Sequence, residues 1–511
     1  MEQEKTNAEN FCFTEPKFDI TSAVDCGGEY IMPDYFPEIR KIVSCTASAL
    51  PDSKFLSGEN LEYGGTLAFT VLYIGNDGAL VSLPYATEYS GKCQLPAEVK
   101  GTGEIAVDAA AEDIQCRVLA PRKVSLRSKV RCNIYADSRR EYHITYSDGE
   151  SAPLSLAEKS TVQSLTKIIP VMCGGRGAVT GSASGELREN KGSKPVSCAG
   201  AVNITEVRCR KDAVNVRGEA VVRCLVFSSD GVYRSAKAVL PFEETVTAAG
   251  CKEGDACRAW GRAASVTVTE GEDGVLKAEA EYDLEAEWSR AQQLTVTEDA
   301  YSTGWSAVSE KSEFQPVSAL CCTSSSLTVS GSGKRTTKPQ NGEYLVDMTC
   351  EGVLTGAEQK ENKLTLTGKC NVKAYIAADG EVICEEMSLP VKFETNAMSQ
   401  AGEGKLVVRS HVSTTDINGR LEGDTFFANC ELCISVSVRR QAKATPVTKV
   451  VFDRNSPISR NTAQIKVFYP SSEETVWNIA KKYLAPADKI EKVNGISRYD
   501  VARNAVLIPE R

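Results

Sequence analysis

Three segments of the chain repeat one pattern of apolar and polar positions. In each, an extended apolar run reaches Asp-Gly, a second extended run follows, and proline and an acidic residue close the pattern. The Asp-Gly pairs are residues 77–78, 230–231 and 379–380, spaced 153 and 149 residues apart. Because a tight hairpin turn needs a positive φ that glycine adopts freely, Asp-Gly between two extended runs predicts a β-hairpin.

A strand with alternating apolar and polar residues follows each hairpin. Its central apolar residues are Ile134, Leu284 and Ile434, which lie 57, 54 and 55 residues after the turn aspartate. Alternation with a period of two predicts a sheet with one buried face. A solenoid unit is roughly 20–50 residues long, so this longer period predicts three copies of a whole antiparallel β domain. The predicted repeats are residues 35–150, 168–302 and 316–440.

The last forty-odd residues carry a different pattern, which predicts the order strand, helix, helix, strand. Ile465, Val467 and Tyr469 alternate as in a strand, and Pro470 ends that strand because proline cannot continue a hydrogen-bonded ladder. A first helix is then indicated by apolar residues at helical spacing. These residues are Val476, Ile479, Ala480 and Tyr483.

The second predicted helix begins at Pro486, where the missing N–H group has no helical partner to lose. Ile490 and Val493 would form its apolar face, and Asn494-Gly495 would end it. A short strand over residues 505–508 closes the unit, which we assign to residues 464–511.

Two segments lie outside these units. Residues 441–463 are polar and contain several prolines, a composition that predicts a flexible linker. Residues 1–34 fit no repeat and are expected to form an N-terminal extension that is either loose or packed on the first repeat. The predicted fold class is therefore mainly β, with three tandem antiparallel domains and a small βααβ domain.

The C-terminal run TVWNIAKKY, followed by NG and LIP, resembles a LysM domain. LysM domains are binding modules, usually for glycans that contain N-acetylglucosamine, and are not catalysts. Three β domains with the Asp-Gly pattern ahead of such a module resemble the SPOCS-domain (SipL-like) spore coat morphogenetic proteins of endospore-forming Firmicutes. This resemblance implies a role in the mother-cell cytosol at the forespore surface, with a SpoIVA-type coat ATPase as partner.

The LysM resemblance implies a groove between the loop before the first helix and the loop before the last strand. Here Glu473-Glu474-Thr475 replaces the usual Gly-Asp-Thr, and Arg503-Asn504 replaces the usual Gly-Gln. Glycine permits close backbone approach to a ligand, whereas charged rims suit a protein partner. Trp477 is expected to pack in the core rather than contact a ligand. The candidate residues for binding a partner or a glycan are Ser472, Glu473, Glu474, Thr475, Trp477, Lys481, Lys482, Tyr483, Ile496, Arg503 and Asn504.

The charge and the hydropathy pattern narrow the set of partners. The net charge of −9 provides no basic patch, so neither nucleic acid nor an anionic membrane is an expected partner. No apolar run approaches the ~20 residues that span a bilayer. The first twenty residues lack the basic and apolar regions of a signal peptide, so we expect the chain to stay in the cytosol.

The nineteen cysteines are expected to be reduced thiols, as is usual in the cytosol. Most lie singly within apolar alternation, where they behave as small buried hydrophobic residues; examples are Cys132, Cys224 and Cys370. Cys430 and Cys433 form one C-x-x-C pair, but no second pair completes a zinc site. No metal site and no cofactor are predicted.

No set of catalytic residues is recognisable in the sequence. The two histidines, His143 and His411, are expected in surface or turn positions, and neither accompanies a nucleophile motif. The glycine-rich segment 174–185 lacks the lysine of a phosphate-binding loop and is expected to be a loop or a bulged strand. The chain is therefore predicted to be a non-enzymatic scaffold and adaptor in endospore coat assembly. The alternative is a peptidoglycan-binding protein of the cell wall or cortex.

Overall fold

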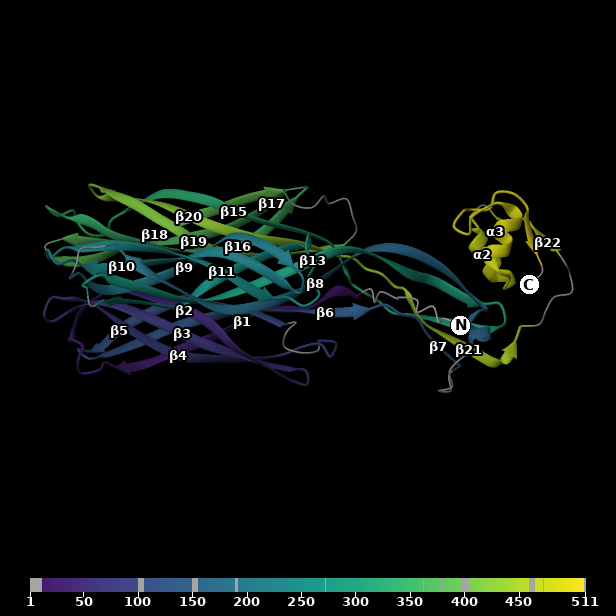
Figure 1. The fold of residues 1–511 in the computed structure, drawn as a ribbon, viewed down its shortest axis with the longest axis horizontal. Coiled ribbons are helices and arrows are strands. Elements are labelled where there is room, and N and C mark those ends of the chain that lie inside the picture. The colour runs from purple at the N-terminus through teal and green to yellow at the C-terminus, as the bar shows by residue number, and fades with distance from the viewer. Residues whose placement is uncertain are drawn as a thin grey trace.

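The computed structural model of the chain describes ten segments: residues 12–99, 105–148, 155–188, 192–271, 273–361, 363–378, 380–396, 404–458, 465–471 and 473–509. Most of these residues lie in antiparallel strands, so the expectation of a mainly β chain is confirmed. Figure 1 shows an elongated body of strands, a narrower neck and a small unit with two helices at the far end. We call this last unit, residues 465–509, the C-terminal module.

The body consists of three repeats with one topology. In each repeat the first, sixth and fifth strands form one sheet with the sixth in the middle. The second, third and fourth strands form the other sheet with the third in the middle, and all these pairings are antiparallel. The recurrence of one connectivity agrees with the period of about 150 residues.

The strands of the first repeat are β1 (Cys12–Ile31), β2 (Ile39–Ser57), β3 (Asn60–Gly75), β4 (Leu80–Gln94), β5 (Ile105–Ala120) and β6 (Lys123–Glu141). Those of the second are β8 (Val162–Leu187), β9 (Lys194–Arg210), β10 (Ala213–Phe227), β11 (Tyr233–Thr247), β12 (Ala256–Glu270) and β13 (Leu276–Ser302). Those of the third are β15 (Val317–Lys334), β16 (Tyr344–Lys360), β17 (Lys363–Ala378), β18 (Glu381–Asn396), β19 (Lys405–Glu422) and β20 (Thr425–Gln441).

The described part of the predicted N-terminal extension is an integral strand of the first repeat. β1 pairs with β6 along its whole length, from Cys12 opposite Glu141 to Ile31 opposite Lys123. Of the two alternatives for residues 1–34, the described part is packed on the first repeat, but as one of its own strands, so the predicted start of that repeat at residue 35 is too late. Without β1 the strand β6 would be left with an open edge. The second repeat likewise begins at Val162, earlier than the predicted boundary at 168.

The Asp-Gly pairs form hairpin turns as predicted where the structure describes them. Residues 77–78 join β3 to β4 and residues 230–231 join β10 to β11. Gly78 has φ +85°, Gly231 has φ +84° and Gly380, between β17 and β18, has φ +78°. Asp379 lies outside the described residues. These positive φ values explain why glycine follows each turn aspartate.

Each repeat has its own apolar core between its two sheets. Ile134, Leu284 and Ile434 lie on the central strands β6, β13 and β20, and each is fully buried. Burial of such a side chain contributes about 1.5–3 kcal/mol. The alternation in the sequence therefore identified the strand that holds each core together.

The three repeats also share a buried apolar cluster, so they are not independent domains. The residue three positions after each turn aspartate, which is Leu80, Tyr233 or Val382, belongs to one buried cluster between the repeats. The backbone N–H of Leu80 donates to the hydroxyl of Tyr233 at 3.2 Å. One sequence position in each copy therefore serves the contact between copies.

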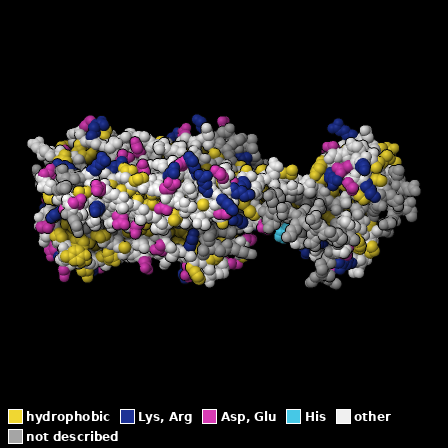
Figure 2. Space-filling view, viewed as in Figure 1, with side chains coloured by type: hydrophobic (Ala, Val, Ile, Leu, Met, Phe, Trp, Pro, Cys, Tyr) yellow, Lys and Arg dark blue, Asp and Glu magenta, His cyan; other side chains and the backbone are white. Residues whose placement is uncertain are grey.

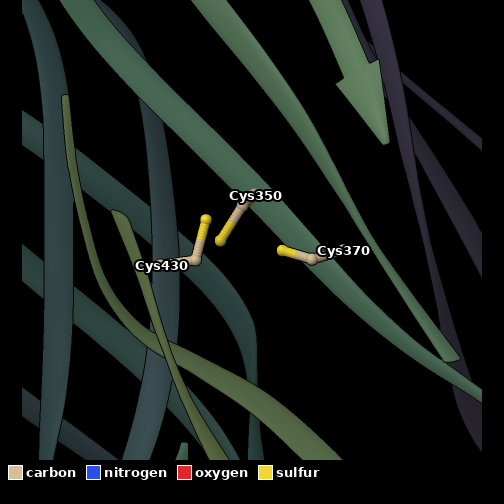
Figure 3. Close-up of side chains that lie close together, drawn as sticks. All are labelled: Cys350, Cys370 and Cys430. Atoms are coloured by element: carbon tan, nitrogen blue, oxygen red, sulfur yellow. The ribbon is translucent and has the colours of Figure 1, made fainter. Parts of the chain in front are cut away.

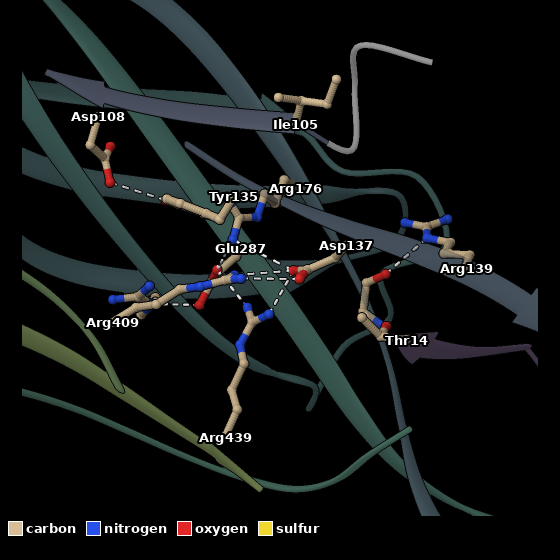
Figure 4. A network of polar contacts seen from close by, with 12 residues as sticks. Thr14, Ile105, Asp108, Tyr135, Asp137, Arg139, Arg176, Glu287, Arg409 and Arg439 are labelled. Carbon is tan, nitrogen blue, oxygen red and sulfur yellow. Dashed lines mark hydrogen bonds and ion pairs between the residues drawn. The ribbon is translucent and has the colours of Figure 1, made fainter. Parts of the chain in front are cut away.

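A network of arginines and carboxylates forms a second contact between the repeats, separate from the apolar cluster (Figure 4). Three residues beyond each central apolar residue lie Asp137, Glu287 and Ser437. Arg439 bridges the first two, with Nη1 2.6 Å from Asp137 Oδ2 and Nη2 3.0 Å from Glu287 Oε2. Arg409 makes two 3.1 Å hydrogen bonds to Asp137. These four residues come from all three repeats.

The same guanidinium groups set the charge of the two buried carboxyls. Burial alone would raise the pKa of Asp137, but Arg439, Arg409 and Arg176 outweigh it and hold that pKa below its ordinary value. The pKa of Glu287 is also held well below the ordinary value, because Arg258, Arg439 and Arg176 outweigh burial. Both groups are therefore carboxylates at neutral pH.

The neck is built from the segments that follow the three repeats. These are β7 (Thr145–Ser147), β14 (Trp305–Lys311) and β21 (Val447–Pro457), and they form one sheet with β21 in the middle. Between the first two repeats lies a single helical turn, α1 (Leu156–Lys159). The flexible linker predicted over residues 441–463 is therefore wrong for its described part, because its apolar residues are paired in this sheet. Val447, Val450 and Phe452 are buried.

The second repeat extends into the neck. β8 has 26 residues and β13 has 27, whereas β1 in the first repeat has 20. The extra length of β8 and β13 carries the C-terminal module at its end, as Figure 1 shows.

Candidate functional site

The C-terminal module has the predicted order of strand, helix, helix, strand. Its elements are β22 (Ile465–Phe468), α2 (Val476–Tyr483), α3 (Ala487–Asn494) and β23 (Val506–Pro509). Thr475 caps α2, because its hydroxyl accepts the N–H of Asn478 at 3.2 Å. Pro486 precedes α3, and Gly495 ends it with φ +65°. Val493 does not lie on the apolar face of α3 as predicted, since it is 51% exposed.

Trp477 lies in the core of the module, as expected, and also contacts the second repeat. Its side chain is buried, with the ring centroid of Tyr301 5.0 Å away. Its indole Nε1 donates to Asp299 Oδ2 at 2.9 Å. Both partners lie on the extended part of β13, so the tryptophan joins the module to the body.

Further contacts attach the module to the same extension. Lys481 Nζ lies 2.7 Å from both carboxylate oxygens of Asp299. The Tyr301 hydroxyl donates to the carbonyl of Ala485 at 2.6 Å, and the Tyr499 hydroxyl donates to the carbonyl of Thr166 at 2.8 Å. The module is therefore docked on β8 and β13 and is not a free domain on a tether.

The LysM resemblance implies a glycan groove between the loop before α2 and the loop before β23. These two loops lie side by side, but they are hydrogen-bonded to each other. Thr475 and Val501 form an isolated antiparallel bridge. The N–H groups of Val476 and Trp477 donate to loop carbonyls at 3.1 Å, and Ala502 N–H donates to the carbonyl of Glu474 at 2.9 Å. These backbone donors are therefore already engaged. Ile496 is half-buried against the module core.

The charged candidates in these loops differ in their surroundings. Glu473, Arg503 and Asn504 are exposed. Glu474 accepts the N–H of Ser471 at 3.0 Å, a bond that lowers the pKa of its carboxyl. Ser472 lies outside the described residues.

The remaining candidates on α2 point in two directions. Lys481 forms an ion pair with Asp299, so part of its hydrogen-bonding capacity is used within the chain. Lys482 Nζ lies 4.7 Å from the ring centroid of Phe468, and Tyr483 packs edge-on against the same ring at 5.5 Å. Tyr483 is half-buried, so it supports the strand β22 rather than standing free.

Three exposed residues that were not among the candidates mark the outer face of the module. Val467 is 56% exposed, Tyr469 is 78% exposed and Leu507 is 37% exposed. Val467 and Leu507 are directly opposite each other on β22 and β23. The alternation of Val467 and Tyr469 in the sequence could have indicated that they lie on one face, because alternate residues of an extended segment point to the same side.

Three thiols that no sequence motif predicts lie close together in the third repeat. The sulfurs of Cys350, Cys370 and Cys430 lie within 4.8 Å of one another in the core of the third repeat (Figure 3). Thiols at this separation can bind a soft metal ion or exchange into a disulfide. They come from β16, β17 and β20, so no sequence spacing reveals them. Cys430 therefore has other sulfur neighbours than the Cys433 of its C-x-x-C motif.

The histidines and the glycine-rich segment are structural. His143 is exposed, but His411 lies within β19 near Trp260, with ring centroids 6.4 Å apart, so the surface prediction is wrong for His411. Burial lowers the pKa of His411. Residues 174–185 lie in β8, where a Cβ on Gly177 would come within 2.0 Å of the carbonyl oxygen of Thr247. The glycine thus permits close packing of β8 and β11.

Comparison with protein-family models, curated proteins and solved structures found no match to this chain. The fold itself defines a class: tandem six-stranded β-sandwiches that carry a docked strand–helix–helix–strand module. Within the described segments, the helices are all too short or too polar to cross a membrane.

Proposed function

We propose that this chain is a non-enzymatic scaffold and adaptor in endospore coat assembly. Its C-terminal module binds a coat morphogenetic protein of the SpoIVA-type ATPase class at the forespore surface. Two features support the proposal: the sequence resemblance to SPOCS-domain proteins, and a body whose repeats are joined by a common core and a common ion network. Such a body can hold a binding module at a fixed distance from other contacts.

The observation that carries the proposal is the exposed outer face of the docked module. Val467 and Leu507 place apolar side chains in solvent on a two-stranded sheet, and Tyr469 does so directly after the strand β22. Figure 2 shows hydrophobic side chains at the surface of this end of the molecule. Large exposed apolar groups beside charged ones are typical of protein interfaces, and tyrosine is enriched there. Glu473 and Arg503, in the loops that follow β22 and precede β23 along the chain, are exposed charged residues.

Peptidoglycan binding is the second candidate function, and the LysM resemblance favours it. A neutral sugar is held by backbone hydrogen bonds and apolar faces. Here the N–H groups of Val476, Trp477 and Ala502 are bonded within the module. The glycines that allow close approach are also replaced by Glu473 and Arg503. A protein partner therefore accounts better for the geometry.

The test compares two binding assays on the full chain. The first is co-purification with a SpoIVA-type ATPase, and the second is sedimentation with purified peptidoglycan. We expect capture of the ATPase, loss of that capture in Tyr469→Ser, and no pelleting with peptidoglycan. Val493→Ser, which removes an exposed apolar group from α3, is the control for a general loss of surface hydrophobicity. Strong pelleting without ATPase capture would make the glycan-binding reading correct.

A further inference from the structure

A cavity of about 250 Å³ lies where the three repeats meet at the neck end of the body. Its wall includes β6 and β1 of the first repeat, β8 and β13 of the second, and β15 and β20 of the third. The polar residues that matter most are Ser138, Arg139, Arg176, Trp288, Ser289 and Arg439. Arg139 is exposed at the mouth, whereas Arg439 is buried.

The charge around this cavity is unbalanced. Of the described residues that line it, Asp137 is the acid, and Arg139, Arg176 and Arg439 are the bases. Both oxygens of Asp137 are already bonded, one to Arg409 alone and the other to Arg409 and Arg439. Asp137 therefore has little capacity left to neutralise the arginine at the mouth.

The surplus persists when the surrounding network is included. Arg176, Arg258, Arg409 and Arg439 share two carboxylates, Asp137 and Glu287. The position that carries an acid in the first two repeats is Ser437 in the third. Asp108 and Glu285 lie among the cations Lys54 and Arg262, and Arg262 also pairs with Asp283, so these groups add no further positive charge. A buried surplus of positive charge is costly unless an anion compensates it.

Several wall residues carry buried polar atoms without a hydrogen-bond partner among the described residues. These atoms are Arg176 Nη1 and Nη2, Trp288 Nε1, Ser138 Oγ and Ser289 Oγ. Arg176 Nη2 still lies 3.3 Å from Glu287, in ion-pair range but outside hydrogen-bond geometry. The indole and guanidinium groups are donors only, so their unmet demand is for an acceptor. Unsatisfied buried donors are rare in folded proteins and call for an explanation.

Gly175 shapes the mouth so that two donors converge there. A Cβ at this position would lie 2.0 Å from Arg139 Nη2 and 2.9 Å from Trp288 Nε1. Glycine therefore leaves room for the guanidinium and the indole N–H to lie side by side. Arg139 is further held by its Nε, which donates to the carbonyl of Gly174 at 2.9 Å. No carboxylate in the described segments forms an ion pair with Arg139.

Part of the lining is apolar. Met172, Val317 and Leu320 line the cavity, and Met172 and Val317 are buried. A ligand that fills the cavity therefore meets both cationic donors and hydrocarbon. This combination suits an anion with an apolar body better than a bare inorganic ion.

We propose that this cavity binds a small organic anion whose carboxylate or phosphate oxygens accept hydrogen bonds from Arg139, Trp288 and Arg176, and whose apolar part contacts Met172 and Val317. The inference is independent of the coat partner of the C-terminal module. Because the ligand would touch all three repeats, its binding would stabilise their association by mass action.

The test is calorimetric titration of the full chain with phenyl phosphate, benzoate and inorganic phosphate. We expect saturable binding at one site, with at least one of the two aromatic anions binding more tightly than inorganic phosphate. The affinity should decline as the salt concentration rises. Whether phenyl phosphate or benzoate binds more tightly distinguishes a phosphate ligand from a carboxylate ligand. Absence of saturable binding by all three anions would overturn the proposal.

Two variants connect such binding to this cavity. Arg139→Gln removes the exposed guanidinium at the mouth, and Gly175→Ala displaces that guanidinium without removing its charge. Each should weaken binding by about tenfold, as expected for the loss of a charge-assisted hydrogen bond. Arg127→Gln, an exposed arginine twelve residues earlier on β6, should bind like the unaltered chain. Equal affinity in all three variants would assign the binding to another place and refute the cavity assignment.

Discussion

Trp477 donates its indole N–H to the carboxylate of Asp299 at 2.9 Å, across 178 residues of sequence. The same carboxylate binds Lys481, and the tryptophan ring packs against Tyr301. One acidic residue at the end of an elongated strand therefore fixes the orientation of the C-terminal module on the body. The module is presented by the second repeat, although in sequence it follows the third.

Removing this carboxylate should undock the module without unfolding it. Asp299→Ala eliminates the three hydrogen bonds that this carboxylate accepts from Trp477 and Lys481, and a hydrogen bond to a charged group contributes about 1.5–3 kcal/mol. We expect faster amide hydrogen exchange over residues 162–166 and unchanged exchange within α2. Glu298→Ala, at an adjacent half-buried residue whose carboxylate lies 3.5 Å from Lys167, is the matched control. Unchanged protection in Asp299→Ala would show that the apolar contacts suffice for docking.

The arginine network should make stability depend strongly on Arg439. Arg439→Met leaves Asp137 and Glu287 short of a buried partner, a change that typically costs about 3–5 kcal/mol. Urea denaturation at pH 7 measures the loss. Arg420→Met, an exposed arginine on β19 whose partner Glu422 is also exposed, should change stability by less than about 1 kcal/mol.

The pH dependence of unfolding should follow from the same two carboxyls. Their folded pKa values lie below the ordinary values, so they stabilise the fold above the unfolded pKa values near 4. This contribution is lost as pH falls through the lower, folded pKa values. We therefore expect urea midpoints to be flat from pH 7 to 5 and to fall below about pH 4. Arg439→Met raises the folded-state pKa values of Asp137 and Glu287 toward their unfolded values, so these carboxyls stabilise the variant less at neutral pH. The difference in urea midpoint between the variant and the unaltered chain should therefore shrink as the pH is lowered. A constant deficit would show that the two carboxyls are not linked to Arg439.

The sequence predicted those features that depend on local chemistry. Asp-Gly turns need positive φ, so the hairpins at Gly78 and Gly231 followed directly from the residues. Alternation likewise identified the strands that bury Ile134 and Leu284. Helical spacing and the flanking Pro486 located α2 and α3, with small errors at their ends.

The features that the sequence did not predict depend on contacts between distant segments. Residues 12–31 and 447–457 look irregular alone, and they become strands only because β6 and the neck sheet offer them partners. Lys481 looked like a free surface lysine because Asp299 is far away in sequence. The sulfurs of Cys350, Cys370 and Cys430 converge for the same reason.

The cysteines should all be reactive thiols once the chain is unfolded. None of the nineteen is joined in a disulfide in the structure. Mass tagging of freshly isolated protein, denatured without added reductant, should give nineteen modifications. In the folded state Cys370 and Cys430 should resist tagging, since both are fully buried. Fewer than nineteen tags after denaturation would reveal disulfides, for which Cys12 and Cys173, whose sulfurs lie 2.8 Å apart, are the first pair to test.

Partner capture by the module should separate into an apolar contribution and an electrostatic one. Tyr469 is 78% exposed, so Tyr469→Ala should fold normally. If its ring is an anchor, the variant should lose about 2 kcal/mol or more of binding free energy, mainly through faster dissociation. Arg503→Ala removes an exposed charge and should mainly slow association, an effect that disappears at high salt. Surface plasmon resonance against a SpoIVA-type ATPase at low and high salt measures both rates. If the effect of Arg503→Ala on binding persists at high salt, this arginine is buried by the partner. If Tyr469→Ala binds normally, the interface does not include the end of β22.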